Sequence, residues 1–239
     1  IPVSDSVSID NTAPSIVAVI ISPDPAYADD TLECSWIGYA DAEGDPDLSM
    51  PDWYVDGVFA SSGSTLSGVF AKDQLITCSV VPYDGFSSGT GMSTSMTISN
   101  KPPEIVSLSI SPTAPMTTDE LTVVVSTDDA DGDPLTLSYT WWVDGADSGL
   151  GSVDSVPDSA TSRDQSWSVT VWPNDGTEDG LSMSSAPVTI GNTAPTTPVI
   201  AISPSAPVTE TDDLVCEVLT ASYDADGDPI SMGFTWTLD

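Results

Sequence analysis

The sequence predicts an all-β protein built from tandem repeats, and three observations carry this prediction. The motif Asn11-Thr12-Ala13-Pro14 recurs in related form at Asn100 and again at Asn192, at offsets of 89 and 92 residues. Many short segments alternate apolar and polar residues with a period of two, which is typical of half-buried strands. Helical periodicity is absent. These features indicate consecutive β domains of about 90 residues each.

Each repeat carries the same further motifs in the same order. Ile-Ser-Pro stands at 21–23, 110–112 and 202–204, and an acidic loop follows at 41–46, 129–134 and 224–229. Seven residues after the Pro of each acidic loop comes a tryptophan: Trp53, Trp141 and Trp236. We therefore divide the chain into the last strand of a preceding repeat (1–10), two complete repeats (11–99 and 100–191) and the first half of a further repeat (192–239). The alternative is that the N-terminal strand of one chain completes the half repeat of the next. We prefer the former because one strand cannot replace half a domain.

The second repeat shows the expected strands most clearly. Apolar residues alternate with polar ones over 121–125, 135–143 and 166–172, and Gly, Pro and Asp separate these segments. About seven such strands fit into 90 residues, which is the size and rhythm of an immunoglobulin-like β-sandwich. Because Pro-containing linkers without a Gly/Ser tract join the repeats, we expect an elongated, semi-rigid rod.

The three cysteines can be placed on this sandwich. Cys34 falls on the expected second strand and Cys78 on the sixth, and these two strands face each other across such a fold. We predict a disulfide between Cys34 and Cys78, which indicates an oxidising, extracellular compartment. A pair of buried free thiols is the alternative. The second repeat has Val123 and Val169 at the same positions, and Cys216 takes the second-strand position of the third repeat.

Together, the cysteine pair, the strand tryptophan, the Asn-Thr-Ala-Pro linker and the Asp-Ala-Asp-Gly-Asp-Pro loop resemble a known group of domains. They are similar to tandem immunoglobulin-like repeats of large prokaryotic extracellular surface proteins, which include polycystic-kidney-disease-type and cadherin-like domains. Two family features differ: Ile76 stands where an immunoglobulin domain has Tyr, and the Trp-Asp-Phe-Gly-Asp-Gly motif is missing. The resemblance implies a stalk, fibre or adhesin shaft at the cell surface, and no catalysis.

The acidic loops predict calcium sites. Calcium takes six to eight oxygen ligands, and Asp at alternating positions around a Gly supplies several from one short loop. The loops after the expected sixth strands add an Asp-Gly pair at the same end of the sandwich, where the linker asparagine also enters. The candidate ligands are Asn11, Asp41, Glu43, Asp45, Asp84, Asn100, Asp129, Asp131, Asp133, Asp175, Asn192, Asp224, Asp226 and Asp228. The alternative is that these segments are ordinary turns, which we prefer for Asp56-Gly57 and Asp144-Gly145.

Charge and composition exclude several functions. The chain has 37 acidic residues, three basic residues and no His, giving a formal net charge of −34. We therefore expect no nucleic-acid partner and no insertion into a membrane, and we expect no enzyme activity. Lys72 and Lys101 have no evident counterparts in the other repeats, so we do not expect isopeptide cross-links. The expected partners are copies of the chain itself or other surface proteins. Carbohydrate binding, or a spacer role beside a secreted enzyme, is the alternative.

Overall fold

The computed structural model describes residues 7, 10–205, 209 and 211–237. The chain divides into two compact units. The first comprises Ile1–Pro102 with the acidic loop Asp129–Pro134, and the second comprises Pro103–Asp128 with Leu135–Asp239. Most of the strand expected over residues 1–10 lies outside the described residues.

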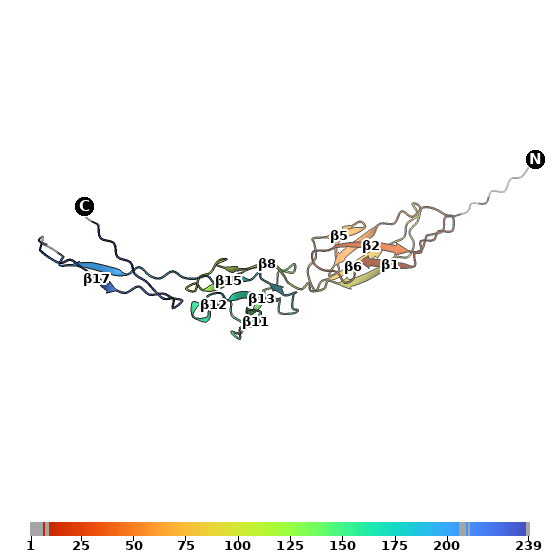
Figure 1. The fold of residues 1–239 in the computed structure, drawn as a ribbon. Coiled ribbons are helices and arrows are strands. Elements are labelled where there is room, and N and C mark those ends of the chain that lie inside the picture. The colour runs from red at the N-terminus through yellow and green to blue at the C-terminus, as the bar shows by residue number, and fades with distance from the viewer. Residues whose placement is uncertain (1–6, 8–9, 206–208, 210, 238–239) are drawn as a thin grey trace, which may run out of the picture. The chain divides into compact units, whose positions relative to one another are not determined.

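The first repeat is a sandwich of two antiparallel sheets (Figure 1). One sheet has the order β1 (Ala18–Ser22), β2 (Thr31–Ile37), β5 (Thr65–Ser67). The other has the order β4 (Val58–Ser62), β3 (Pro51–Val55), β6 (Leu75–Val80), β7 (Met92–Thr97). Alternating residues of both sheets face the interior, where the side chains of Leu32, Trp53 and Ile76 are fully buried. The predicted sandwich of about seven strands is confirmed in this repeat.

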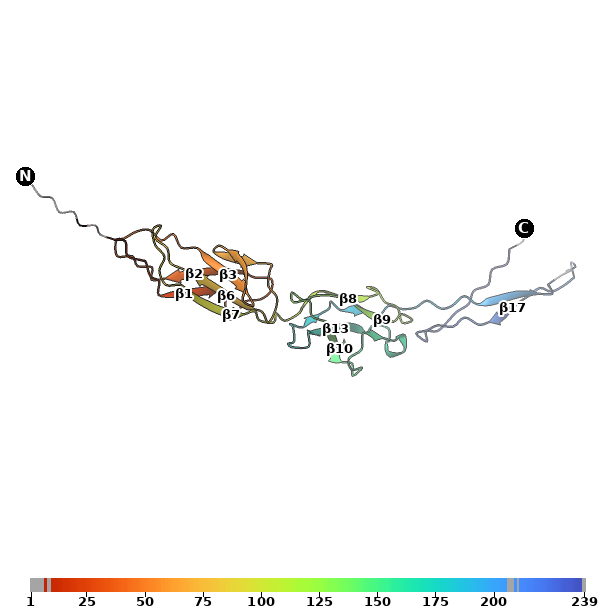
Figure 2. The same ribbon diagram turned by 180° about the vertical axis from the view of Figure 1, so that it is seen from behind.

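The second repeat has the same two-sheet arrangement (Figure 2). The first sheet runs β12 (Ser155–Val156), β9 (Leu121–Asp128), β8 (Glu104–Ser111). The second runs β11 (Ala146–Asp147), β10 (Thr136–Val143), β13 (Ser166–Asn174), β14 (Met183–Ser184), and β15 (Val188–Thr189) also pairs with β13. A short 3₁₀ helix spans Asp158–Ala160. The core centres on Trp141 and Trp167, whose rings meet edge to face with centroids 6.3 Å apart.

The predicted disulfide is confirmed. Cys34 on β2 and Cys78 on β6 are bonded across the two sheets of the first repeat, with their Cα atoms 6.3 Å apart. The strand register shows that the second repeat is built alike, because Trp53 pairs with Cys78 and Trp141 pairs with Val169. A valine thus fills the position of the second cysteine in a fully buried site.

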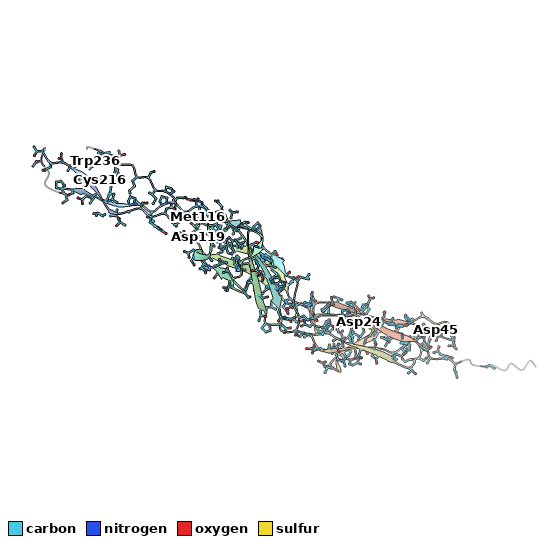
Figure 3. All side chains as sticks on the ribbon, turned by 60° about the horizontal axis from the view of Figure 1, so that its bottom comes forward. Asp24, Asp45, Met116, Asp119, Cys216 and Trp236 are labelled. Atoms are coloured by element: carbon cyan, nitrogen blue, oxygen red, sulfur yellow. A yellow bond between two sulfur atoms is a disulfide. The ribbon has the colours of Figure 1, made fainter. Side chains whose placement is uncertain are left out.

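The third repeat contributes one strand pair, β16 (Val199–Ser203) and β17 (Val215–Thr220). Ile202 lies opposite Cys216, as Ile110 lies opposite Val123 in the second repeat. Its apolar residues are not covered: Ile202 is 51% exposed and Trp236 is 53% exposed, whereas Trp141 is 1% exposed. Figure 3 labels Cys216 and Trp236, which line one shallow groove on this strand pair. The groove is open because no second sheet covers this pair among the described residues.

In the part of the chain that the structure describes, no helix is long and apolar enough to cross a membrane.

Candidate metal sites in the acidic loops

The first aspartate of each acidic loop closes the loop on itself. In the second repeat, Asp129 Oδ1 accepts hydrogen bonds from the backbone N–H groups of Asp131, at 2.9 Å, and Asp133, at 3.1 Å. Asp41 and Asp224 accept the equivalent pairs in the other two loops, at 2.9 to 3.1 Å. One carboxylate oxygen therefore fixes the loop backbone, and this leaves the second oxygen for another partner.

The middle acid of each loop holds the linker that carries the asparagine motif. Glu43 Oε2 accepts a hydrogen bond from the N–H of Thr12 at 3.1 Å. Asp131 Oδ2 accepts one from the N–H of Lys101 at 2.7 Å, and Asp226 Oδ2 accepts one from the N–H of Thr193 at 2.8 Å. The same backbone contact thus occurs in all three repeats, always one residue after the linker asparagine.

The third acid binds a basic side chain in two of the three loops. Asp133 Oδ2 forms an ion pair with Lys72 Nζ, which also donates to Asn100 Oδ1 at 2.9 Å. Asp228 Oδ2 forms an ion pair with Arg163, whose NH1 group also donates to Asn192 Oδ1 at 2.6 Å. No basic group among the described residues contacts the third acid of the first loop, Asp45.

The structure corrects our interpretation of Lys72, for which we found no counterpart. Arg163 occupies the equivalent position 91 residues later, and each is followed by Asp-Gln. The change from Lys to Arg hid the correspondence, and the following Asp-Gln pair was the signal that could have shown it. Both basic residues make the same two contacts, so they are part of the candidate site.

The aspartates that follow β6 and β13 are buried turn residues. Asp84 is 1% exposed and its Oδ1 accepts the N–H groups of Phe86 and Ser87, while Asn11 Nδ2 donates to its Oδ2 at 2.8 Å. Burial acts to raise the pKa of Asp84, but these hydrogen bonds outweigh it and lower the pKa to about 2. Asp175, 6% exposed, likewise accepts the N–H groups of Thr177 and Glu178 at 2.6 Å. Donors therefore already surround Asp84, and the structure brings it together with Asn11.

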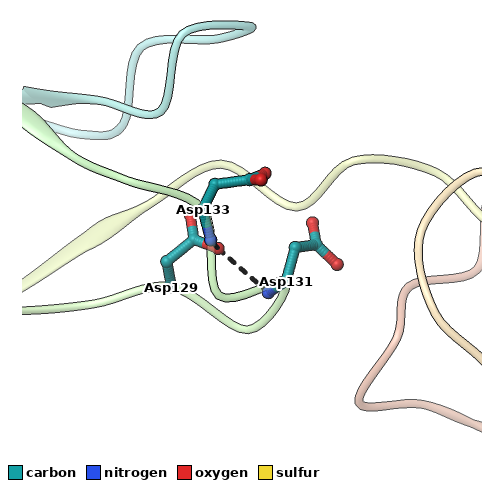
Figure 4. A group of neighbouring side chains, drawn as sticks. All are labelled: Asp129, Asp131 and Asp133. Atoms are coloured by element: carbon teal, nitrogen blue, oxygen red, sulfur yellow. Dashed lines mark hydrogen bonds between the residues drawn. The ribbon is translucent and has the colours of Figure 1, made fainter.

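Each acidic loop leaves at least one buried carboxylate oxygen without a hydrogen-bond partner. The four atoms are Asp41 Oδ2, Asp129 Oδ2, Asp131 Oδ1 and Asp226 Oδ1. The second loop brings three carboxylate oxygens within 4.8 Å of one another, one each from Asp129, Asp131 and Asp133 (Figure 4). Among the described residues this is the one acidic group that is so closely spaced. A buried carboxylate oxygen without a donor is costly, because it loses its hydration and gains nothing in return.

Like charges act on each other in the first loop as well. Burial, followed by the charges of Asp41, Asp84 and Glu43, raises the pKa of Asp45. These acids therefore lie close enough to repel one another. A hard cation that accepts oxygen ligands would relieve both the repulsion and the unpartnered oxygens, so the donor set fits calcium.

Known proteins resemble this chain only weakly, in sequence and in overall structure. No protein-family model and no curated protein matches it.

Three similar structures contain fibronectin type-III domains. A two-domain segment of chicken tenascin is 15% identical and has a TM-score of 0.37, with 75% of this chain and 99% of that chain covered. The FN1–FN3 domains of chicken CNTN1 are 9% identical and have a TM-score of 0.31, with 76% and 68% covered. The fibronectin(III)-like modules of Clostridium thermocellum CbhA are 15% identical and have a TM-score of 0.26, with 73% and 94% covered. Because these TM-scores are below 0.5, the tandem immunoglobulin-like fold rests on the strand order and register of the chain itself.

Proposed function

We propose that the chain is a structural segment of an extracellular repeat protein, such as a stalk, fibre or adhesin shaft, and that calcium bound by the acidic loops stiffens its linkers. Three features support this proposal: the repeated sandwich, the disulfide and the acidic loop that contacts each linker. Disulfides persist in oxidising compartments, which favours a location outside the cell.

One observation carries the calcium proposal. Asp129 Oδ2 and Asp131 Oδ1 are buried and accept no hydrogen bond. Asp133 uses its Oδ2 in the ion pair with Lys72, and its Oδ1 accepts none of the hydrogen bonds found among the described residues. The three acids thus keep one oxygen each for a cation, while their other oxygens hold the loop, the linker and a basic side chain.

The chemistry of this donor set favours calcium. Three carboxylate oxygens leave several positions of the calcium shell to water or backbone carbonyls, whereas magnesium demands a smaller and stricter octahedron. Sites of this kind in extracellular modules bind with a Kd of about 10⁻⁴ to 10⁻³ M. We therefore expect calcium to bind in the millimolar range that occurs outside cells.

The contact that would transmit stiffness is the backbone hydrogen bond from each linker to the middle acid. Lys101 N–H donates to Asp131 Oδ2, and Thr193 N–H donates to Asp226 Oδ2. A cation on the opposite oxygen of the same carboxylate fixes that side chain in place. The carboxylate then holds the linker backbone with less motion.

The test is a calcium titration of thermal unfolding with the full chain. We expect the unfolding temperature to rise between about 0.1 and 10 mM calcium, because a ligand that binds the folded state stabilises it by mass action. The double variant Asp129→Asn/Asp131→Asn should lose much of this rise. Asp154→Asn, which removes one exposed charge outside the loops, should keep it. An unchanged midpoint at 10 mM calcium in the wild-type chain would sink the proposal.

A second candidate function is a binding module for carbohydrate or another surface protein. It is favoured by an open groove in the second unit, lined by hydroxyl groups of Thr117, Thr118 and Ser159 and by Tyr223, which is 68% exposed. Exposed aromatic rings and hydroxyl groups are the contacts that sugars accept. A glycan array with the wild-type chain and a Tyr223→Ala variant separates this function from the structural one.

A further inference from the structure

Two basic side chains make the same pair of contacts in two different repeats. Lys72 binds the third acid of an acidic loop and the linker asparagine Asn100. Arg163 binds the corresponding acid and the corresponding asparagine, Asn192. The chain has only three basic residues against 37 acids, and two of them occupy this one position. The placement therefore points to a specific task rather than to general charge balance.

The loops that carry these side chains are also built alike. We call residues 71–74 and 162–165 the basic loops. In the first, Asp73 adopts a left-handed backbone with φ of 67°, and its N–H donates to Ile98 O at 2.9 Å. The N–H of Ile98, which is 1% exposed, donates back to Gln74 O at 3.0 Å. Two backbone hydrogen bonds thus anchor this loop to the buried residue Ile98, next to the position of the basic side chain.

The second basic loop repeats this geometry. Asp164 has φ of 68° and its N–H donates to Ile190 O at 2.9 Å, while Ile190 N–H donates to Gln165 O at 3.0 Å. In both loops the glutamine side chain accepts the N–H of the residue three positions earlier, at 2.8 and 2.7 Å. Because the loop is fixed at both ends, the basic side chain needs little further ordering to reach its acid.

We propose that Lys72 and Arg163 are positioning residues through which one repeat recognises the acidic loop of the next repeat, without need of calcium. We propose by the same geometry that Asn11 and Asp45 form the acceptor for such a basic loop on another repeat of this kind. This inference goes beyond the calcium proposal, because the recognising group is a side-chain cation.

The acceptor on the first repeat is complete except for its cation. Asn11 Nδ2 donates to Asp84 and Ser87, and its Oδ1 accepts none of the hydrogen bonds found among the described residues. No basic group of the described chain contacts Asp45. In the other two cases a single ammonium or guanidinium group bridges the corresponding asparagine and acid. We expect Asn11 and Asp45 to accept such a group in the same way. Its partner is therefore a repeat with a Lys/Arg-Asp-Gln loop.

The test measures amide hydrogen exchange by NMR on the full chain in EDTA. The Lys101 and Thr193 N–H groups report on the two linkers. Each donates to the middle acid of a loop whose third acid is ion-paired with Lys72 or Arg163. Lys72→Met should lower the protection of the Lys101 amide up to about fivefold and leave the Thr193 amide unchanged. Arg163→Met should do the reverse. Its effect should be nearer twofold, because its ion pair is 38% and 39% exposed whereas that of Lys72 is 20% and 24% exposed.

Charge exchange and a matched control separate recognition from simple loss of structure. Lys72→Asp should lower Lys101 protection further, and adding Asp133→Lys should restore it. Asp45→Asn should leave the Thr12 amide unchanged or more protected, because it removes repulsion and breaks no ion pair. Equal loss of protection at both linkers, or no loss in either single variant, overturns the recognition proposal.

The partner of the first repeat is tested by extending the chain. In a protein with residues 11–99 duplicated ahead of Asn11, the added basic loop should raise the protection of the original Thr12 amide by about the same factor. This rise should vanish with Asp45→Asn or with Lys72→Met in the added copy. No rise in the extended chain overturns this part of the proposal. All these measurements are made without calcium, so a failure of the calcium titration leaves their outcome untouched.

Discussion

The disulfide of the first repeat gives a prediction with an internal control. We consider the variant Cys34→Val/Cys78→Val, which gives the first repeat the type of side chain found at Val123 and Val169 in the second. Both cysteines are almost fully buried, so valine keeps the site apolar and occupied. The variant therefore removes the covalent link while disturbing the packing little.

The magnitude follows from the length of the closed loop. The two cysteines are 44 residues apart, and closing a loop of this length removes about 4 kcal/mol of unfolded-state entropy at 25 °C. Measured effects often fall below this limit, so we expect a loss of about 2–4 kcal/mol. With a urea m-value of about 2 kcal/mol/M, the unfolding midpoint of the first repeat should fall by about 1–2 M.

The assay is urea unfolding of the full chain, followed by amide cross-peaks of β6 and β13. The β6 peaks report on the first repeat and should move to lower urea. The β13 peaks report on the second repeat, which has no disulfide, and should stay in place. Reduction of the wild-type protein should reproduce the shift of β6. An unmoved β6 midpoint, or an equal fall of both midpoints, would refute the reasoning.

Three further predictions concern the acidic turn, the core and a close backbone approach. Asn11→Ala removes a donor to Asp84, so the pKa of that carboxyl rises from about 2 toward the unfolded value of about 3.9. Because the folded pKa is the lower one, the charged form stabilises the first unit above about pH 4 and this stabilisation is lost as pH falls toward 2. The variant should therefore unfold at higher pH in an acid titration followed by circular dichroism, and an unchanged acid midpoint contradicts the assignment. Trp141→Ala should cost about 3–5 kcal/mol in urea unfolding, whereas Trp236→Ala, at a 53% exposed position, should cost well under 1 kcal/mol. Gly180→Ala should destabilise the second unit by about 1–3 kcal/mol, because its Cβ would lie 1.9 Å from a linker carbonyl oxygen. Gly233→Ala meets no atom within 4 Å and should be neutral in the same urea unfolding assay.

Most of the fold could be predicted from the sequence because it depends on local patterns. Period-two alternation placed the strands, and the matched spacing of motifs placed the repeats. The pairing of Cys34 with Cys78 followed from the sandwich, since the second and sixth strands face each other. The short strands β5, β11, β12, β14 and β15 are too brief to produce an alternating pattern, so sequence reasoning could not locate them.

The candidate site could be predicted only in part. The acidic loops and the buried Asp84 were found because they repeat, but the sequence treated all their acids as equivalent ligands. In the structure the three acids of a loop have different tasks, since the first closes the loop, the second holds the linker and the third, in two of the three loops, binds a basic side chain. The contacts of each acid depend on which of its oxygens faces which donor, and a sequence pattern does not show this.

The basic side chains were missed for a related reason. Lys72 and Arg163 differ in residue type, and their contacts lie 61 and 65 residues further along the chain. Only the fold brings them to an acidic loop. The charge of −34 therefore has a more definite meaning than its size alone suggests, because two of the three basic side chains lie where the acidic loops meet the linkers.

The most direct test of the central claim is the binding of calcium to the full chain, measured by isothermal titration calorimetry. We predict saturable binding with a Kd of about 10⁻⁴ to 10⁻³ M, and Asp129→Asn/Asp131→Asn should lower the number of bound ions by one. Asp154→Asn should leave that number unchanged. Absence of saturable binding up to 10 mM calcium, or a double variant that binds as many ions as the wild type, would contradict it.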